Sequence, residues 1–321
     1  MKRYIGKRAL SGLLVVLLSV CFNFTLIRLA PGDPIRIMAG TDNPNEEMIE
    51  ALQQKYGLDK SIPEQFVMFL GNVAKGDLGY SYISDESVIK LIGEKIGPTL
   101  ALSLTAVVLS VTIGTLIGIY AARKNGSKFD QFVCSISYVF DATPGFWLGL
   151  MMILIFASTL KWFPTSGMVN LRANYKGFAY FADVCRHQVL PIVTMVLTQT
   201  PYYFRIARSS VLQVMSEDFI TTFKATGMKE SRIFNKYVLR NAILPTVTVL
   251  GMSLAFLLSG SVLIETVFAW PGMGRLMFSS ISKRDYPVLT GIYLVTSVVI
   301  CIAMILVDIL YGFIDPRIRY D

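Results

Sequence analysis

Residues 97–122 read GPTLALSLTAVVLSVTIGTLIGIYAA and contain no charged side chain. An α-helix rises about 1.5 Å per residue, so about 20 apolar residues cross the roughly 30 Å hydrocarbon core of a bilayer. Because lipid offers no partner for a backbone N–H or C=O group, a segment that crosses it singly must be helical. This stretch therefore predicts a membrane-spanning helix.

Uncharged runs of similar length recur along the chain and set the number of expected spans. The other five runs cover residues 9–27, 142–160, 187–204, 241–264 and 286–307. The third span is expected to begin earlier, near Phe132, with Asp141 inside it, and the fourth is short and interrupted by Pro191 and Pro201. We predict an all-α polytopic membrane protein with six transmembrane helices.

The overall composition agrees with a membrane protein. Hydrophobic residues make up 53% of the chain and charged residues 16%, against about 25% charged in ordinary soluble domains. These values exclude a disordered chain, a disulfide-stapled secreted module and a soluble two-domain enzyme.

The distribution of positive charge predicts the orientation. The predicted cytoplasmic segments are 1–8, 123–131, 205–240 and 314–321, and together they hold 16 Lys and Arg against 6 acidic residues. The predicted external segments are 31–96, 161–186 and 268–285, and they hold 13 of each. Cytoplasmic loops collect Lys and Arg, so both termini are predicted to be cytoplasmic. The net charge of +8 is explained in this way rather than by nucleic-acid binding.

Two segments outside the spans are long. Residues 31–96 carry prolines and a helical pattern over residues 45–56, and we expect them to form an external cap on the first span. We divide the chain into a cytoplasmic N-terminus with the first span (1–30), this cap (31–96), a five-helix permease core (97–313) and a cytoplasmic tail (314–321).

The second long segment is the cytoplasmic loop 205–240 within that core. Apolar residues recur at helical spacing before and after Gly227, which predicts two short amphipathic helices joined at that glycine. The alternative is a hairpin lying on the membrane surface, since the loop carries seven cations.

Short motifs in this loop and elsewhere resemble a known family. Residues 218–227 (DFITTFKATG) and 239–245 (LRNAILP) resemble the EAA loop of ABC-importer permeases, in the branch that imports oligopeptides, dipeptides and nickel. Thr221, Thr222 and Phe223 stand where the general motif has Glu-Ala-Ala, while Gly227 is kept. Further stretches resemble the first of that branch's two permease subunits: 28–34 (RLAPGDP), 76–81 (GDLGYS), 98–100 (PTL), 265–274 (ETVFAWPGMG) and 284–288 (RDYPV).

The resemblance implies a type I ABC importer permease in the cell membrane of a prokaryote, taking up peptides. The implied partners are a second homologous permease, two ATP-binding subunits, an external substrate-binding protein and membrane lipid, with no nucleic acid. The chain has no P-loop, so ATP and Mg are expected in the partner subunits, and neither a cofactor nor catalysis is expected here. One histidine and no Cys/His cluster predict no metal site. The alternatives are import of nickel or a metal chelate, and a non-transport membrane scaffold.

The resemblance also places the contact with the ATPase. A short helix around residues 223–228 would enter a groove on the ATPase, with Phe223 and Ala225 as packing contacts and Lys229 and Arg232 pairing with acids. The full set of predicted coupling residues is Phe223, Lys224, Ala225, Thr226, Gly227, Met228, Lys229 and Arg232. The alternative is that these cations only enforce orientation.

Asp141 is the sharpest candidate for the translocation pathway, because a charge near the bilayer centre costs about 3 kcal/mol on insertion scales. Pro144 follows about one helical turn later and, with Gly145, predicts a broken helix. Alternatively, Asp141 is a buried partner for a hydroxyl such as Thr143 or Tyr138, or for a cation of the sister subunit. The further pathway or gate candidates are Glu265, Trp270, Pro271, Gly272 and Gly274, of which the last four predict a turn after the fifth span.

Overall fold

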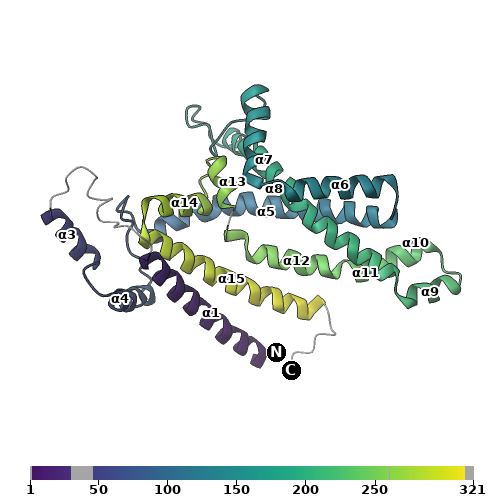
Figure 1. The fold of residues 1–321 in the computed structure, drawn as a ribbon, viewed down its shortest axis with the longest axis horizontal. Helices are drawn as coiled ribbons and strands as arrows, with labels where there is room; N and C mark the ends of the chain where they lie inside the picture. The colour runs from purple at the N-terminus through teal and green to yellow at the C-terminus, as the bar shows by residue number, and fades with distance from the viewer. Residues whose placement is uncertain (1, 30–45, 260, 315–321) are drawn as a thin grey trace. The chain divides into compact units, whose positions relative to one another are not determined.

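The structure is a computed structural model that describes residues 2–29, 46–259 and 261–314 (Figure 1). Its regular elements are helical. Two segments are π-helical, η1 (Ile153–Thr159) and η2 (Ile233–Val238), and η3 (Leu257–Ser259) is a 3-10 turn. The α-helices are α1 (Lys2–Leu29), α3 (Glu46–Tyr56), α4 (Ile62–Ala74), α5 (Val88–Arg123), α6 (Lys128–Ala142), α7 (Gly145–Met152), α8 (Phe178–Met215), α9 (Asp218–Ala225), α10 (Glu230–Arg232), α11 (Leu239–Ala242), α12 (Leu244–Ala255), α13 (Val262–Val267), α14 (Met273–Lys283) and α15 (Tyr286–Ile314).

The chain folds as two compact units. The first comprises Met1–Thr99, Leu258–Val262 and Pro271–Asp321, and the second comprises Leu100–Leu257 and Leu263–Trp270. One boundary falls inside α5, and another separates Trp270 from Pro271. Each unit has its own apolar clusters.

In the first unit, α1 packs along α15, and Arg8 forms an ion pair of 2.9 Å with Asp308. At the other end of α1, Phe24 packs against Phe66 and Phe69 of α4. The predicted helix over residues 45–56 is present as α3. Helix α4 was not predicted, although Ser61 and Glu64 have the capping-box spacing of a helix N-terminus.

The loop before α5 is fixed to the start of α15 by a buried carboxylate. Asp285 accepts hydrogen bonds from the hydroxyl of Ser81 and the backbone N–H of Tyr82. Further along α5, the hydroxyl of Thr99 accepts a 2.7 Å hydrogen bond from the N–H of Met273, the first residue of α14. These bonds hold the first unit together beyond its apolar packing.

In the second unit, α5 and α8 approach very closely. A Cβ atom added at Gly118 would lie 2.7 Å from the carbonyl oxygen of Phe204, and one at Gly114 would lie 2.9 Å from that of Thr200. Only glycine permits this contact, because the atoms that a Cβ would meet are backbone atoms and the Cβ atoms of Tyr203 and Ala207, which cannot rotate away. Small residues at such crossings let helices pack through dispersion contacts where lipid removes the usual hydrophobic driving force.

Two helices differ from the sequence prediction. The first is α8, which was expected to be interrupted by Pro191 and Pro201 but continues through both, and both prolines are buried. Membrane helices tolerate such prolines because neighbouring groups satisfy the freed carbonyls. The predicted run 241–264 was also wrong in its bounds: helical backbone already begins at Glu230, and α12 ends at Ala255. Pro245 does not interrupt this stretch because it falls in the first turn of α12, where no intrahelical N–H bond is needed.

Four helical stretches of the described residues are long and apolar enough to cross a membrane, namely Leu10–Leu29, Val88–Arg123, Glu230–Ala255 and Tyr286–Ile309. The pair Lys128–Ala142 and Gly145–Thr159 bends by 97° and can count as a fifth. The run 187–204 lies in α8, which is not among them. The all-α membrane fold is confirmed, and the total of six spans stays a prediction.

Candidate functional site

Helix α9 ends in a glycine-dependent turn at the predicted site. Gly227 has φ +74°, in the left-handed region that favours glycine. Its N–H donates to the carbonyl of Lys224, and the N–H of Met228 donates to that of Phe223. These two bonds form a Schellman motif, which satisfies carbonyls that the helix end leaves free. The helix therefore ends at Ala225 and does not continue over residues 223–228 as predicted.

The apolar faces of the loop point inward and form its own small core. Ile220 of α9 and Ile233, Phe234 and Val238 of η2 are buried against Val211 near the end of α8. Phe223 stacks on Tyr237 with ring centroids 4.4 Å apart. The loop is thus a packed knob of α9, α10, η2 and α11 beside the end of α8 (Figure 1), which disfavours a flat hairpin spread on the membrane surface.

The predicted coupling residues separate into two groups in this knob. Phe223 and Met228 are half-buried and pack against the knob's own apolar core. The exposed group comprises Lys224, Ala225, Thr226, Gly227, Lys229 and Arg232. The surface available to a partner is therefore a cationic tip around the Gly227 turn. Phe223 packs beneath this tip against the apolar core of the knob.

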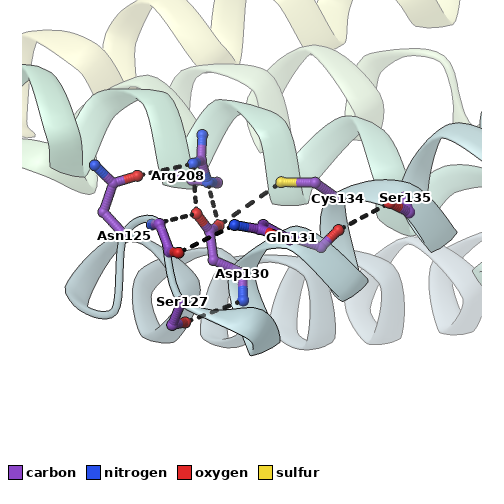
Figure 2. Close-up of polar contacts among 8 residues, drawn as sticks. Asn125, Ser127, Asp130, Gln131, Cys134, Ser135 and Arg208 are labelled. Atoms are coloured by element: carbon purple, nitrogen blue, oxygen red, sulfur yellow. Dashed lines mark hydrogen bonds and ion pairs between the residues drawn. The ribbon is translucent and has the colours of Figure 1, made fainter.

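A buried ion pair fixes α8 to the turn between α5 and α6 (Figure 2). The guanidinium of Arg208 binds the carboxylate of Asp130 through two bonds, Nε to Oδ1 at 2.6 Å and Nη2 to Oδ2 at 2.8 Å. Nη2 also donates to the side-chain oxygen of Asn125 at 3.0 Å. The Asp130 carboxylate accepts from the N–H of Gly126, and its own N–H donates to the hydroxyl of Ser127, which caps α6.

We call these residues (Asn125, Gly126, Ser127, Asp130 and Arg208) the clasp. Sequence reasoning missed it. Two signals were present: Asp130 is the only acid in the basic segment 123–131, and it follows the capping Ser127 by three residues, a spacing typical of helix N-termini. Neither signal names Arg208 as the partner.

Asp141 is paired within its own chain. Its carboxylate forms an ion pair with Arg205 of α8, with a nearest nitrogen–oxygen distance of 2.9 Å. The hydroxyl of Thr143, considered as a partner from the sequence, instead donates to the carbonyl of Val139. The predicted break follows directly, because α6 ends at Ala142 and α7 begins after Pro144.

The predicted gate residues lie on both sides of a unit boundary. Glu265 and Trp270 are wholly buried in the second unit, and the N–H of Trp270 donates to the carbonyl of Glu265 at 2.8 Å. Trp270 packs in a cluster with Leu102, Ala106 and Phe268. Pro271, Gly272 and Gly274 belong to the first unit, where Gly272 precedes α14. The predicted turn is present, with Ala269 at φ +49°.

No group of three or more His, Cys, Asp or Glu side chains able to hold a metal ion occurs in the described part of the chain. His187 is buried in α8, and its Nδ1 lies 2.8 Å from the backbone carbonyl of Asp183. The contact of this imidazole is therefore with the backbone of its own helix.

Two family profiles match most of the chain. Residues 1–104 match the N-terminal part of binding-protein-dependent transport system membrane components, and residues 114–320 match the binding-protein-dependent transport system inner membrane component.

Curated relatives extend over the full length. The di/tripeptide transport system permease protein DppB of Pseudomonas aeruginosa (strain UCBPP-PA14) is 38% identical over 313 residues, covering 93% of each chain. The oligopeptide transport system permease protein AppB of Bacillus subtilis (strain 168) is 34% identical over 324 residues, covering 100% of each.

The fold itself has a solved counterpart. A structure of the MetNI methionine ABC transporter in an inward facing conformation superposes with a TM-score of 0.56 at 17% identity, covering 71% of this chain and 97% of the other. At that identity the likeness shows the fold alone. By the two profiles and the full-length relatives, the chain belongs to the family of binding-protein-dependent transport system inner membrane components, multi-pass permeases of ABC transport systems.

Proposed function

We propose that this chain is one of two homologous permease subunits of an ATP-driven importer that takes up peptides from an external binding protein. The observation that carries the proposal is the packed knob with its exposed cationic tip, in a chain whose relatives are named for di/tripeptide and oligopeptide transport. ATP hydrolysis falls to two partner subunits, and this chain converts their closure into movement of its helices.

Contacts within the second unit support a route for that movement. The knob packs on the end of α8 through Val211, and Arg208 and Arg205 of α8 hold α6. A displacement of the Gly227 tip by an ATPase would therefore be passed to α8 and then to α6. Differential contact of the tip with open and closed ATPase dimers would shift the population of permease states.

Asp141 and the gate residues belong to the proposed pathway. Asp141 lies beside the broken helix and is half-exposed even while paired with Arg205. A carboxylate in this state keeps a wet face that can meet a cationic group of a peptide. Glu265 and Trp270, with Pro271, Gly272 and Gly274, would form the element that opens and closes the external end.

The test is uptake by the complete transporter in proteoliposomes, with its binding protein outside and ATP inside. We expect accumulation of a labelled tripeptide, absent when this permease is omitted. Radioactive nickel, free or chelated, serves as the matched comparison. Accumulation of nickel without peptide would show that the substrate is a metal or its chelate. Assembly of the complex without uptake of either would favour a non-transport scaffold.

Asp141→Asn separates a pathway role from a structural one. A pathway role predicts a changed ratio of uptake between a Lys-containing and an uncharged tripeptide at normal assembly. An unchanged ratio with reduced assembly would show that Asp141 serves only to hold Arg205.

A further inference from the structure

The first unit contains a cleft of about 560 Å³ between its short helices and the end of α1. Its walls come from α1, α3, α4, the loop before α5 and the start of α15, and they include Phe24, Arg28, Tyr56, Phe69, Tyr82 and Thr290. A volume in the range of about 300–1,000 Å³ is typical of sites for small molecules. The lining combines aromatic rings with charged and amide side chains.

Arg28 is one of two cations that line this cleft, the other being Lys60. Its guanidinium carbon lies 5.0 Å from the ring centroid of Phe24 and 5.4 Å from that of Tyr286. Within the described residues its Nη1 atom is buried without a hydrogen-bond partner. Burial raises the pKa of the neighbouring Tyr82, and the charge of Arg28 opposes this shift. The side chain is thus held by two aromatic rings and by a hydrogen bond with Tyr82.

The acids that line the cleft are Asp77 and Asp85. Asp77 accepts the N–H of Gly79, and the nearby Asp285 accepts from Ser81 and Tyr82. Arg28 as a whole is half-buried. A buried guanidinium nitrogen without a hydrogen bond is costly, and the planar fork of the group suits a phosphate or carboxylate.

The surroundings indicate what carries the anion. Leu26 and Leu29, beside Arg28 on α1, are 52% and 69% exposed. In a membrane helix such side chains face lipid, and Arg28 stands at the end of the apolar run, at the depth of the head groups. A ligand reaching the cleft from there has an anionic head and an apolar body.

We propose that this cleft is a binding site for an anionic group carried on an apolar molecule, bound by Arg28, with an anionic phospholipid as its source. The aromatic walls contact the glycerol and first acyl carbons, and the phosphate accepts hydrogen bonds from the guanidinium of Arg28. The same chemistry is shared by the terminal carboxylate of a peptide, so the experiment separates the two sources.

The test uses the whole transporter in nanodiscs of phosphatidylcholine with a minor fraction of phosphatidylglycerol, analysed by native mass spectrometry. We expect phosphatidylglycerol to be retained on the wild type. Arg28→Gln should reduce retention about tenfold or more, the loss typical of a charge-assisted hydrogen bond. Lys75→Gln removes an exposed cation that does not line the cleft and should retain lipid as the wild type does.

Arg28→Lys covers the case in which the Gln variant does not assemble. It keeps the charge but not the planar fork, so we expect retention between those of the wild type and the Gln variant. Adding a tripeptide with a free or an amidated C-terminus identifies the source: displacement of lipid only by the free acid assigns the cleft to a peptide carboxylate.

Equal retention of phosphatidylglycerol by wild type and Arg28→Gln, with no effect of either peptide, would overturn the proposal.

Discussion

Gly227 fixes the end of α9 by its backbone conformation and not by its size. A Cβ atom added there would meet nothing within 4 Å, so a substitution acts only through φ +74°. An L-residue in the left-handed region costs about 1–2 kcal/mol, and more when it is β-branched. The tip that Gly227 carries is therefore sensitive to residue type even though it is fully exposed.

We expect Gly227→Val to abolish stimulation of the partner ATPases by loaded binding protein, while the complex still assembles. Gly227→Asn is the matched control, because Asn adopts the left-handed region with little cost and should keep most of the stimulation. ATPase rates of the reconstituted transporter measure both. Normal stimulation in the Val variant would show that this turn does not transmit the movement.

The two carboxylates paired with α8 differ in burial, and this difference predicts their energetics. The side chain of Asp130 is 4% exposed and that of Asp141 is 45% exposed. Removing one partner of a buried pair leaves the other charge uncompensated, whereas a solvated pair contributes little.

Asp130→Asn should therefore lower the stability of the assembled complex by about 2–4 kcal/mol, and Asp141→Asn by under about 1 kcal/mol. Thermal unfolding of the purified complex, followed by loss of the intact assembly, provides the comparison. A double-mutant cycle with Arg208→Met should give a coupling energy for the clasp well above that of Arg205 with Asp141. Equal losses in the two Asn variants would contradict the role assigned to burial.

At the scale of elements, the crossing of α5 and α8 depends on two glycines. Their neighbours are backbone atoms and the Cβ atoms of Tyr203 and Ala207, which cannot rotate away as the end of a long side chain can. Any added atom must push the helices apart, and interiors are packed too densely to absorb that shift without loss.

We expect Gly118→Ala and Gly114→Ala each to reduce the yield and thermal midpoint of the complex, with the effect of Gly118 larger because its contact is shorter. Gly97→Ala is the control on the same helix, since a Cβ there meets nothing within 4 Å. Detergent-solubilised yield and fluorescence-detected unfolding measure the three variants side by side. A loss in Gly97→Ala as large as in Gly118→Ala would point to helix propensity instead of the crossing.

At the scale of the whole molecule, the knob, the clasp, Asp141 and the segment Leu263–Trp270 all belong to the second unit. The first unit holds α1, α15 and the short helices of the predicted external cap. The proposed coupling residues of the knob and the pathway residues Asp141 and Glu265 therefore belong to the second unit, whereas the Arg28 cleft belongs to the first.

The predicted orientation follows from the charges of the loops and can be tested on the intact molecule. Cys185 is exposed in a predicted external segment, so it is first replaced by serine to remove its own reaction. In this Cys185→Ser background, Ser84→Cys should react with an impermeant thiol reagent in whole cells. Ser231→Cys, exposed on the knob, should react only after the membrane is opened. The reverse pattern would place the knob outside and remove the basis for coupling to an ATPase.

The sequence by itself determined the membrane class, most of the helical stretches, the break at Pro144 and the turn at Gly227. These features depend on neighbouring residues, through the length of apolar runs, the missing N–H of proline and the freedom of glycine. The tertiary structure alone decided which charges meet: Arg208 pairs with Asp130 across 78 positions, and Arg205 with Asp141 across 64. It also decided that α8 continues through two prolines and that Arg28 turns into a cleft. A partner distant in sequence is chosen by how helices cross, and no local propensity encodes that crossing.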